Sequence, residues 1–234
     1  MIRGNGLIAK AFSEYSNNDN IIIFASGVAN SKETDQFAFE KERNLLQNII
    51  NTFPKRKLIY FSTTSIYDQD LKDYPYLQHK KNMEQLITTL CQHYLVLRLS
   101  EIIGDTKNSN QLLPFLIKKI YTGEKFEVWE KACRRLMHVN DLVLITTELI
   151  NNEIDNDIID MASPQKMKLL DLVHIIENYC GKSGNYELKP IGGCYDINNS
   201  KISLLSKEYH KLQDANYVQN IIKKTINDLR GSGK

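Results

Sequence analysis

Residues 1–27 read MIRGNGLIAKAFSEYSNNDNIIIFASG, and their spacing limits the kind of sheet that this chain can build. Gly4 and Gly6 open a G-x-G-x-x-A turn, in which backbone N–H groups can approach a pyrophosphate at the start of a helix. Residues 21–25, IIIFA, form an unbroken apolar run that is typical of a strand buried on both faces. Only residues 7–20 separate the turn from this strand, which leaves room for one helix and its connection.

The composition is that of an ordinary globular protein. Of the 234 residues, 42% are hydrophobic and 25% are charged, enough for one large domain or one domain with a small cap. The formal net charge of +2 favours neither nucleic acid nor a membrane surface as a partner. We see no apolar stretch of the roughly 20 residues that a membrane span needs and no secretion signal, so we expect a cytoplasmic protein.

The four cysteines are far apart in the sequence and form no C-x-x-C pair. They are Cys91, Cys133, Cys180 and Cys194. The five histidines do not cluster beside them. We therefore expect free thiols, with neither a zinc site nor a disulfide framework, and we expect no bound metal.

Strand-like and helix-like segments alternate along the first half of the chain. Further apolar runs cover residues 57–62, 94–99 and 157–162. Between them lie amphipathic stretches: residues 37–53 carry apolar Phe37, Leu45, Ile49 and Phe53, and Pro75 can open a helix that runs to about residue 94. The alternation predicts an α/β fold with a mainly parallel sheet.

The strand–helix rhythm becomes looser after about residue 104, where Asn and Gly become more frequent. We expect residues 1–104 to form the Rossmann-like core. We expect residues 105–234 to form a small C-terminal substrate lobe, interleaved with the last strands and helices of that core.

The strand that begins at residue 57 ends in four consecutive hydroxyl residues, Ser62, Thr63, Thr64 and Ser65, in the stretch FSTTSIYD (61–68). In α/β sheets the C-terminal ends of the strands form the ligand crevice, so these hydroxyl groups can face a ligand. A Ser/Thr-rich turn that caps the next element is the alternative interpretation.

Tyr76 and Lys80 are four residues apart in PYLQHKKNMEQL (75–86), so on a helix they share a face. An ammonium group near a phenol favours the phenolate and lowers the pKa of the phenol. A tyrosine whose pKa is lowered in this way can act as a general acid or base. The alternative is a surface helix with Tyr76 partly buried and Lys80 in solvent.

Taken together, the three motifs resemble the extended short-chain dehydrogenase/reductase family, and most closely its nucleotide-sugar epimerase/dehydratase branch. The order of glycine turn, hydroxyl-rich strand end and Y-x-x-x-K helix is that of the family. Further segments resemble the family's later motifs: LRLSEIIG (97–104), RRLMHVNDL (134–142), ASPQKMKLLDLVHII (162–176) and NIIKKTINDL (220–229).

The resemblance implies a role for each matching residue. Thr63 would hydrogen-bond the reacting sugar oxygen, Tyr76 would exchange the proton, and Lys80 would hold the nicotinamide ribose and lower the pKa of Tyr76. The implied contacts to NAD or NADP are Gly4, Asn5, Gly6, Leu7, Ile8, Ala25, Ser26 and Lys80. The implied contacts to a nucleotide-diphosphate sugar are Thr64, Ser65, Glu101 and Arg134. A homodimer is also implied, formed through the helices around residues 37–53 and 76–94.

Three departures from the family pattern limit these roles. Thr64 and Ser65 stand where dehydratases carry an acidic pair, which disfavours dehydration, and Glu101 replaces a substrate-binding asparagine. The stretch ASGVANS after the run at residues 21–24 resembles the family's fourth strand and its loop, so the usual second and third strands are predicted to be missing. The acidic residue expected about 20 positions after the glycine turn, which would bind the adenosine ribose, is then missing too.

Two classes of function follow. The first is an NAD(P)-dependent nucleotide-sugar epimerase or ketoreductase that acts through Thr63, Tyr76 and Lys80. The second is a non-catalytic sugar-nucleotide-binding or regulatory homologue that has lost cofactor binding. The retained residues favour the enzyme, and the missing strands favour the binding protein.

Overall fold

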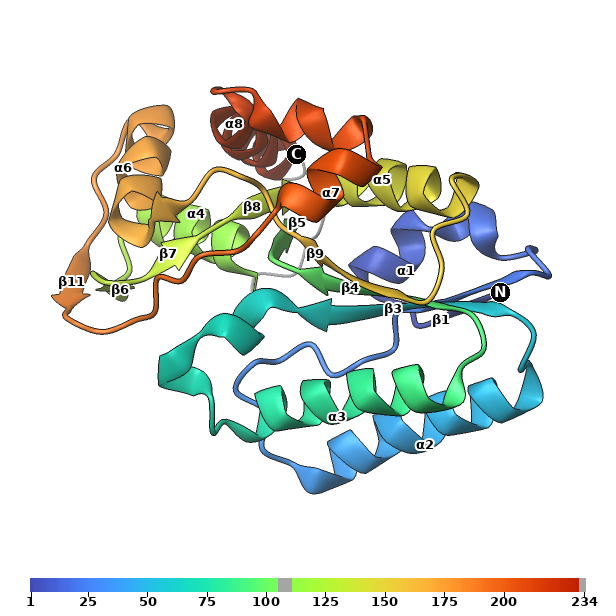
Figure 1. The fold of residues 1–234 in the computed structure, drawn as a ribbon. Coiled ribbons are helices and arrows are strands. Elements are labelled where there is room, and N and C mark those ends of the chain that lie inside the picture. Colours follow the sequence, from blue (N-terminus) through green and yellow to red (C-terminus); the bar gives the residue numbers. More distant parts are fainter. Residues whose placement is uncertain (105–110, 232–234) are drawn as a thin grey trace.

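The computed structural model describes residues 1–104 and 111–231, and its centre is one parallel sheet (Figure 1). Five strands pair in the order β1-β2-β3-β4-β9, and every pairing is parallel. The strands are β1 (Ile2–Arg3), β2 (Ile21–Phe24), β3 (Lys57–Thr63), β4 (Tyr94–Leu99) and β9 (Asp157–Met161). The predicted α/β class with a mainly parallel sheet is thereby confirmed.

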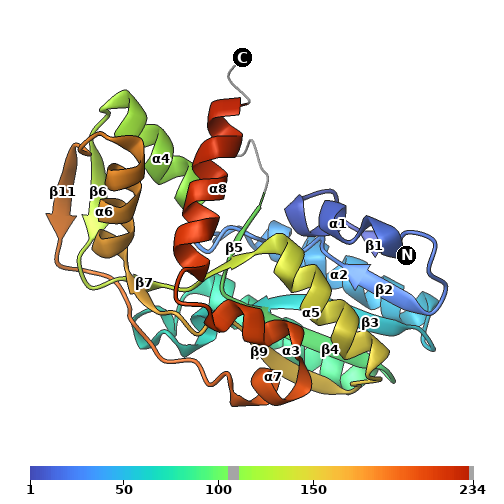
Figure 2. The same cartoon turned by 90° about the horizontal axis from the view of Figure 1, so that it is seen from above.

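Helices cover both faces of the sheet. The two helices on one face are α1 (Leu7–Ala11) and α5 (Val139–Asn151), and those on the other face are α2 (Gln36–Thr52) and α3 (Pro75–Leu90) (Figures 1 and 2). The β3 side chains alternate accordingly, since Ile59 packs with the α1 and α5 residues and Leu58 packs with those of α2 and α3.

The two long helices begin where local signals place them. The side chain of Asp35 accepts a hydrogen bond from the Phe37 backbone N–H and caps α2, and Pro75 occupies the first turn of α3. The expected apolar face of α2 is wrong in part, because Phe37 lies in the first turn and is 72% exposed. The residues that α2 buries are Phe39, Glu42, Leu46, Ile49 and Ile50.

The sheet is wound in a single direction, starting from the edge strand β1. In the described residues no strand lies outside β1, and each later strand adds on the same side of the one before. Yet α1 and α5 lie on one face of the sheet, while α2 and α3 lie on the other. The hand of a crossover depends on the direction to the next strand and on the face that its helix covers. Because the direction is constant and the face is not, two of the four crossovers are left-handed, which is uncommon. Helices on both faces are what a doubly wound sheet shows, and here the strands beyond β1 are missing, as predicted.

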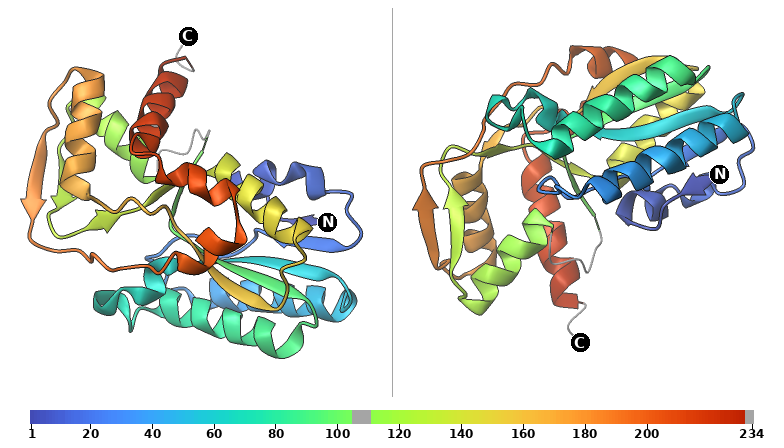
Figure 3. Two further views of the ribbon diagram at one scale, coloured as in Figure 1. Left: turned by 45° about the horizontal axis from the view of Figure 1, so that its top comes forward. Right: turned by 90° about the horizontal axis from the view of Figure 1, so that it is seen from below.

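Most of the remaining elements form a lobe beyond the carboxyl ends of the central strands (Figures 1 and 3). Its strands pair in twos: β5 (Glu101–Ile103) with β8 (Leu136–His138), β6 (Phe126–Trp129) with β11 (Tyr186–Lys189), and β7 (Cys133–Arg134) with β10 (Met167–Lys168). The lobe has its own apolar core, to which three helices contribute. They are α4 (Leu112–Thr122), α6 (Leu169–Cys180) and α8 (Tyr217–Gly231).

Short helical segments complete the described structure. They are η1 (Ser13–Tyr15), η2 (Thr64–Tyr67), η3 (Gln69–Leu71), α7 (Ser200–Leu205) and η4 (Glu208–Gln213). The C-terminal half returns to the central sheet through α5 and β9. The domain boundary expected after residue 104 adjoins residues 105–110, which lie outside the described residues. No helix within the described part is long and apolar enough to span a membrane.

Candidate active site

The glycine turn joins the edge strand β1 to α1, and its geometry requires glycine at one of its two positions. Gly4 has φ +128°, and a Cβ placed there would lie 2.2 Å from the backbone oxygen of Ala25. The Ala25 N–H in turn donates to the Arg3 oxygen at 2.7 Å. The turn therefore lies directly against the end of β2, so the predicted cofactor contacts on the turn are neighbours of Ala25 and Ser26.

The second glycine has a different role. Gly6 precedes α1 with ordinary φ, and a Cβ placed on it would meet nothing within 4 Å. Asn5 and Gly6 are both exposed, so the space in front of α1 is open. The next two residues predicted to contact the cofactor are Leu7 and Ile8, and both side chains pack against the protein. Leu7 packs against Gly104, and Ile8 packs against the apolar core.

The predicted proton-exchange residues meet at the carboxyl end of β3. Thr63 ends the strand, its hydroxyl accepts a hydrogen bond from the Ser65 N–H at 3.1 Å, and it also interacts with the Tyr76 hydroxyl. Tyr76 is only 6% exposed. Burial, the charge of Glu42 and the neighbouring Tyr195 raise the pKa of Tyr76, and the interaction with Thr63 lowers it.

Lys80 lies one helical turn after Tyr76 and is 2% exposed. Its Nζ is 5.9 Å from the centroid of the Tyr76 ring, 3.2 Å from Glu42 Oε1 and 3.1 Å from the Tyr60 hydroxyl. Burial lowers the pKa of Lys80, and the charge of Glu42 opposes that shift. The alternative interpretation of Lys80 as a solvated surface residue is therefore wrong. On balance the pKa of Tyr76 is raised, whereas the resemblance implied that it would be lowered.

Glu42 of α2 is the buried partner of Lys80, and our reading of the sequence missed it. Although burial raises the pKa of this carboxyl, the hydrogen bond with His79 and the charge of Lys80 bring it down to about 2. A signal was available: Glu42 follows Phe39 by three residues and precedes Leu46 by four, so it lies within the buried helix face.

The other hydroxyl groups after β3 point to different places. Thr64 is fully buried and donates to the Leu99 backbone oxygen at 3.3 Å, so its hydroxyl is directed into the protein. Ser65 is partly exposed, and its hydroxyl accepts from Tyr195 at 3.5 Å. Tyr195 thus lies close to Ser65 and Tyr76, although it comes from a late loop that the sequence motifs did not connect to the site.

The two predicted substrate contacts in the lobe lie near each other. Burial raises the pKa of Glu101 on β5, and the positive charge of Arg134 on β7 lowers it. Arg134 donates to the Cys133 backbone oxygen at 2.7 Å and is partly exposed. This side of the site therefore holds one carboxyl and one guanidinium group.

Two other matched residues have structural roles. Glu84 binds the guanidinium of Arg98 and accepts a hydrogen bond from Ser62 at 2.5 Å, which ties α3 to β3 and β4. Asp141 accepts from the Tyr217 hydroxyl at 2.6 Å and anchors α8. These contacts organise the core and the lobe around the site.

The expectation of four free thiols is wrong for one pair, because Cys133 and Cys194 form a disulfide across 61 residues. The loop that carries Cys194 runs beside β7, where the Cys133 N–H donates to the Gly193 oxygen at 3.0 Å. Spacing in the sequence could not reveal this pairing, since it depends on how the loop folds back. Cys91 and Cys180 are free. The bridge anchors the loop that brings Tyr195 to Ser65.

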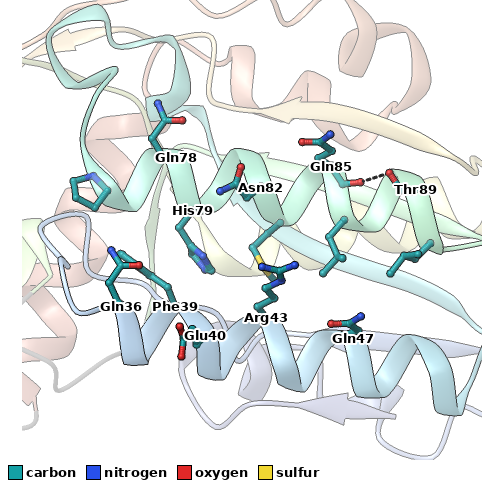
Figure 4. A pocket seen from close by; sticks show the side chains of 14 residues that line it. Gln36, Phe39, Glu40, Arg43, Gln47, Gln78, His79, Asn82, Gln85 and Thr89 are labelled. Carbon is teal, nitrogen blue, oxygen red and sulfur yellow. Dashed lines mark hydrogen bonds between the residues drawn. The ribbon is translucent and has the colours of Figure 1, made fainter.

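A groove of about 700 Å³ runs between α2 and α3, separate from the glycine turn (Figure 4). Side chains of both helices line it, among them Arg43, Gln47, His79 and Asn82. Its mixed polar and apolar lining contains none of the predicted catalytic or cofactor residues. Among the described residues we find no cluster of three histidine, cysteine or acidic side chains that could hold a metal ion.

Solved structures resemble the whole chain. The dTDP-glucose 4,6-dehydratase of Bacillus anthracis, in complex with NAD, matches with TM-score 0.74 at 15% identity, over 96% of this chain and 77% of that one. The UDP-glucose 4-epimerase of Thermus thermophilus, also with NAD, matches with TM-score 0.72 at 14% identity, over 96% and 81%. The GDP-mannoheptose C4 reductase of Campylobacter jejuni, with NADP bound, matches with TM-score 0.66 at 16% identity, over 95% and 85%.

At these identities the likenesses show the fold. No curated protein sequence matches the chain significantly. The family model described as the NAD dependent epimerase/dehydratase family matches residues 2–162, which is well over half of the chain. Together with the parallel sheet, the glycine turn and the grouping of Thr63, Tyr76 and Lys80, this match places the chain in the NAD dependent epimerase/dehydratase family.

Proposed function

We propose that this protein is an NAD(P)-dependent epimerase or ketoreductase of a nucleotide-diphosphate sugar. The observation that carries the proposal is the meeting of the Thr63 and Tyr76 hydroxyl groups at the end of β3, with Lys80 one turn further along α3. Thr63 hydrogen-bonds the reacting sugar oxygen, and Tyr76 exchanges the proton with that oxygen.

The residues of the glycine turn and of α3 fit the pyrophosphate and nicotinamide parts of a dinucleotide. The open space at Gly6 can take a phosphate group, and the N–H groups there can donate to it. Of the three N–H groups of Lys80, Glu42 and Tyr60 account for two among the described contacts, so the third can reach a ribose hydroxyl. A bound nicotinamide would supply the hydride acceptor or donor.

The adenosine part has fewer groups to hold it. The described residues contain no counterpart of the strands that normally follow the glycine turn, and residues 21–27 contain no Asp or Glu to bind the ribose. This observation favours the second candidate, a sugar-nucleotide-binding or regulatory homologue without cofactor. We prefer the enzyme because the proton-exchange residues are gathered in one place.

Substrate contacts come from Ser65 on the core and from Glu101 and Arg134 in the lobe. A guanidinium group suits a diphosphate, and Arg134 is partly exposed. Thr64 is left out, because its hydroxyl already binds the Leu99 oxygen. With Thr64 and Ser65 at the positions of the usual acidic pair, 4,6-dehydration is disfavoured.

A homodimer through α2 and α3 is part of the proposal. The groove between these helices is long, and Phe37 and Leu90 beside it are exposed apolar side chains. Sedimentation at micromolar concentration tests this point. A dimer that Phe37→Glu dissociates supports it, and a monomer for the unchanged protein contradicts it.

Titration of NADH and NADPH by calorimetry separates the two candidate functions. The titrations are run with and without UDP-, dTDP-, GDP- and CDP-sugars. The enzyme proposal expects binding of at least one dinucleotide. Binding of a nucleotide sugar without either dinucleotide, under every condition, would instead support the non-catalytic homologue.

A further inference from the structure

The Glu42 carboxylate is the centre of a buried cluster that the proposed mechanism has not used. It accepts hydrogen bonds from the Val28 N–H at 2.6 Å and the Tyr60 hydroxyl at 2.7 Å, and it binds His79 Nε2 at 2.9 Å and Lys80 Nζ at 3.2 Å. These partners come from the loop after β2, from β3 and from α3. Glu42 therefore joins three elements directly behind the site.

The loop after β2 is shaped to allow this cluster. A Cβ on Gly27 would lie 2.9 Å from both Glu42 Oε1 and Lys80 Nζ. Any larger residue at this position would press on the ion pair. Since Gly27 follows Ala25 and Ser26 directly, the backbone that borders the glycine turn also covers the Glu42–Lys80 pair.

The pairing changes the electric field at Tyr76. A lone ammonium near the phenol would favour the phenolate, but the Glu42 charge 3.2 Å from Lys80 turns that cation into a neutral pair. The other groups that face the pair or the phenol are His79, Tyr60, Glu84, Tyr195 and Thr63. In this setting burial raises the pKa of Tyr76, and the charge of Glu42 raises it further.

We propose that Glu42 is a positioning residue that holds Lys80 in a neutral pair, keeps Tyr76 in its phenol form, and so adapts the site to reduce a sugar carbonyl. The inference rests on the proposed function and narrows its choice between epimerase and ketoreductase. In the reductive step the sugar carbonyl carbon would accept the hydride that a bound dihydronicotinamide supplies, the carbonyl π pair would move to oxygen, and that oxygen would take the Tyr76 proton. Tyr76 would then regain a proton from water, with the hydride donor left in its oxidised form.

An epimerase needs the opposite first step, in which the tyrosine takes a proton from a sugar hydroxyl. A phenol cannot do this until it ionises. A merely structural Glu42, which only ties α2 to α3, would leave the ionisation of Tyr76 unaffected by loss of the Glu42 charge. The two roles can therefore be separated by a measurement on Tyr76 itself.

The test is a pH titration of tyrosinate absorbance on the protein without cofactor. The difference between the protein and its Tyr76→Phe variant isolates Tyr76 from the other tyrosines. Glu42→Gln keeps the size of the side chain and removes its charge, and Glu40→Gln on the exposed side of α2 is the matched control. We expect Glu42→Gln to lower the ionisation midpoint of Tyr76 by about one pH unit or more, and Glu40→Gln to leave it unchanged.

An unchanged midpoint in a folded Glu42→Gln variant would overturn the inference. If that variant does not fold, the unchanged protein still decides: a Tyr76 ionisation midpoint below its ordinary value near 10 contradicts the inference, and a midpoint above 10 supports it. Turnover gives a second readout. In Glu42→Gln, the pH at which alcohol oxidation reaches half of its maximal rate should fall by the same amount as the Tyr76 midpoint, because that step needs the phenolate. Absence of all dinucleotide binding would refute the proposed function, whereas the Tyr76 titration tests Glu42 independently.

Discussion

The carboxyl end of β3 and the turn after β1 are the two halves of the proposed site, and they differ in how much structure surrounds them. The β3 end lies within the sheet, and Thr63, Tyr76 and Lys80 are almost fully buried there. The turn after β1 lies at the sheet edge, and residues 3–6 are exposed. The groups proposed for proton exchange are therefore held by the core, while the groups proposed for phosphate binding depend on a few backbone contacts.

The largest expected effect concerns the buried half. Tyr76→Phe removes the proton that the proposed mechanism transfers to the reacting oxygen. It should lower turnover by roughly 10²–10⁴-fold, the range for general acid–base catalysis. Steady-state kinetics with the nucleotide sugar identified by titration measures this loss, and sugar-nucleotide affinity should stay within a few-fold. Turnover close to that of the unchanged protein would remove Tyr76 from its role.

The second effect concerns the stability of the same half. Lys80→Met leaves the Glu42 carboxylate buried without its cation, which should cost about 3–5 kcal/mol of unfolding free energy. Urea unfolding measures it, with Lys81→Met on the exposed face of α3 as control. In the double variant Lys80→Met, Glu42→Gln, part of the lost stability should return. If Lys80→Met costs no more than Lys81→Met, the two charges are not a buried pair.

A smaller effect separates the two glycines of the exposed half. Gly4→Ala places a methyl group against the Ala25 oxygen at a positive φ, so it should destabilise the protein by roughly 1–3 kcal/mol. Gly6→Ala meets no neighbour and should leave thermal unfolding nearly unchanged, while it weakens dinucleotide binding by crowding the open space. Equal effects of both variants on stability and on binding would show that the turn has no separate structural and ligand-binding positions.

Much of this arrangement could be predicted from sequence because it depends on local spacing. The continuous apolar runs identify the central strands, and the 14 residues between Gly6 and Ile21 leave no room for two more strands. The order of Thr63, Tyr76 and Lys80 along a strand end and a helix predicts their meeting. These features involve one element or two consecutive ones.

The features that we did not predict arise from contacts between distant segments. Glu42 on α2 pairs with Lys80 on α3. Tyr195 contacts Ser65, which is 130 residues away in the sequence. Cys194 bonds to Cys133 only because the loop after β11 folds back beside β7. The raised pKa of Tyr76 also arises from distant segments, because it depends on burial and on Glu42 rather than on the Y-x-x-x-K spacing alone.

The central claim is that half of the usual dinucleotide site is enough, and one comparison of affinities tests it most directly. Calorimetry would measure binding of NADH and of reduced nicotinamide mononucleotide, which lacks the adenosine part, in the presence of the nucleotide sugar. We predict that both bind and that their dissociation constants differ by no more than about tenfold, or roughly 1.4 kcal/mol. NADH binding that is about a thousandfold tighter would show strong adenosine contacts and would contradict the claim, as would binding of neither compound.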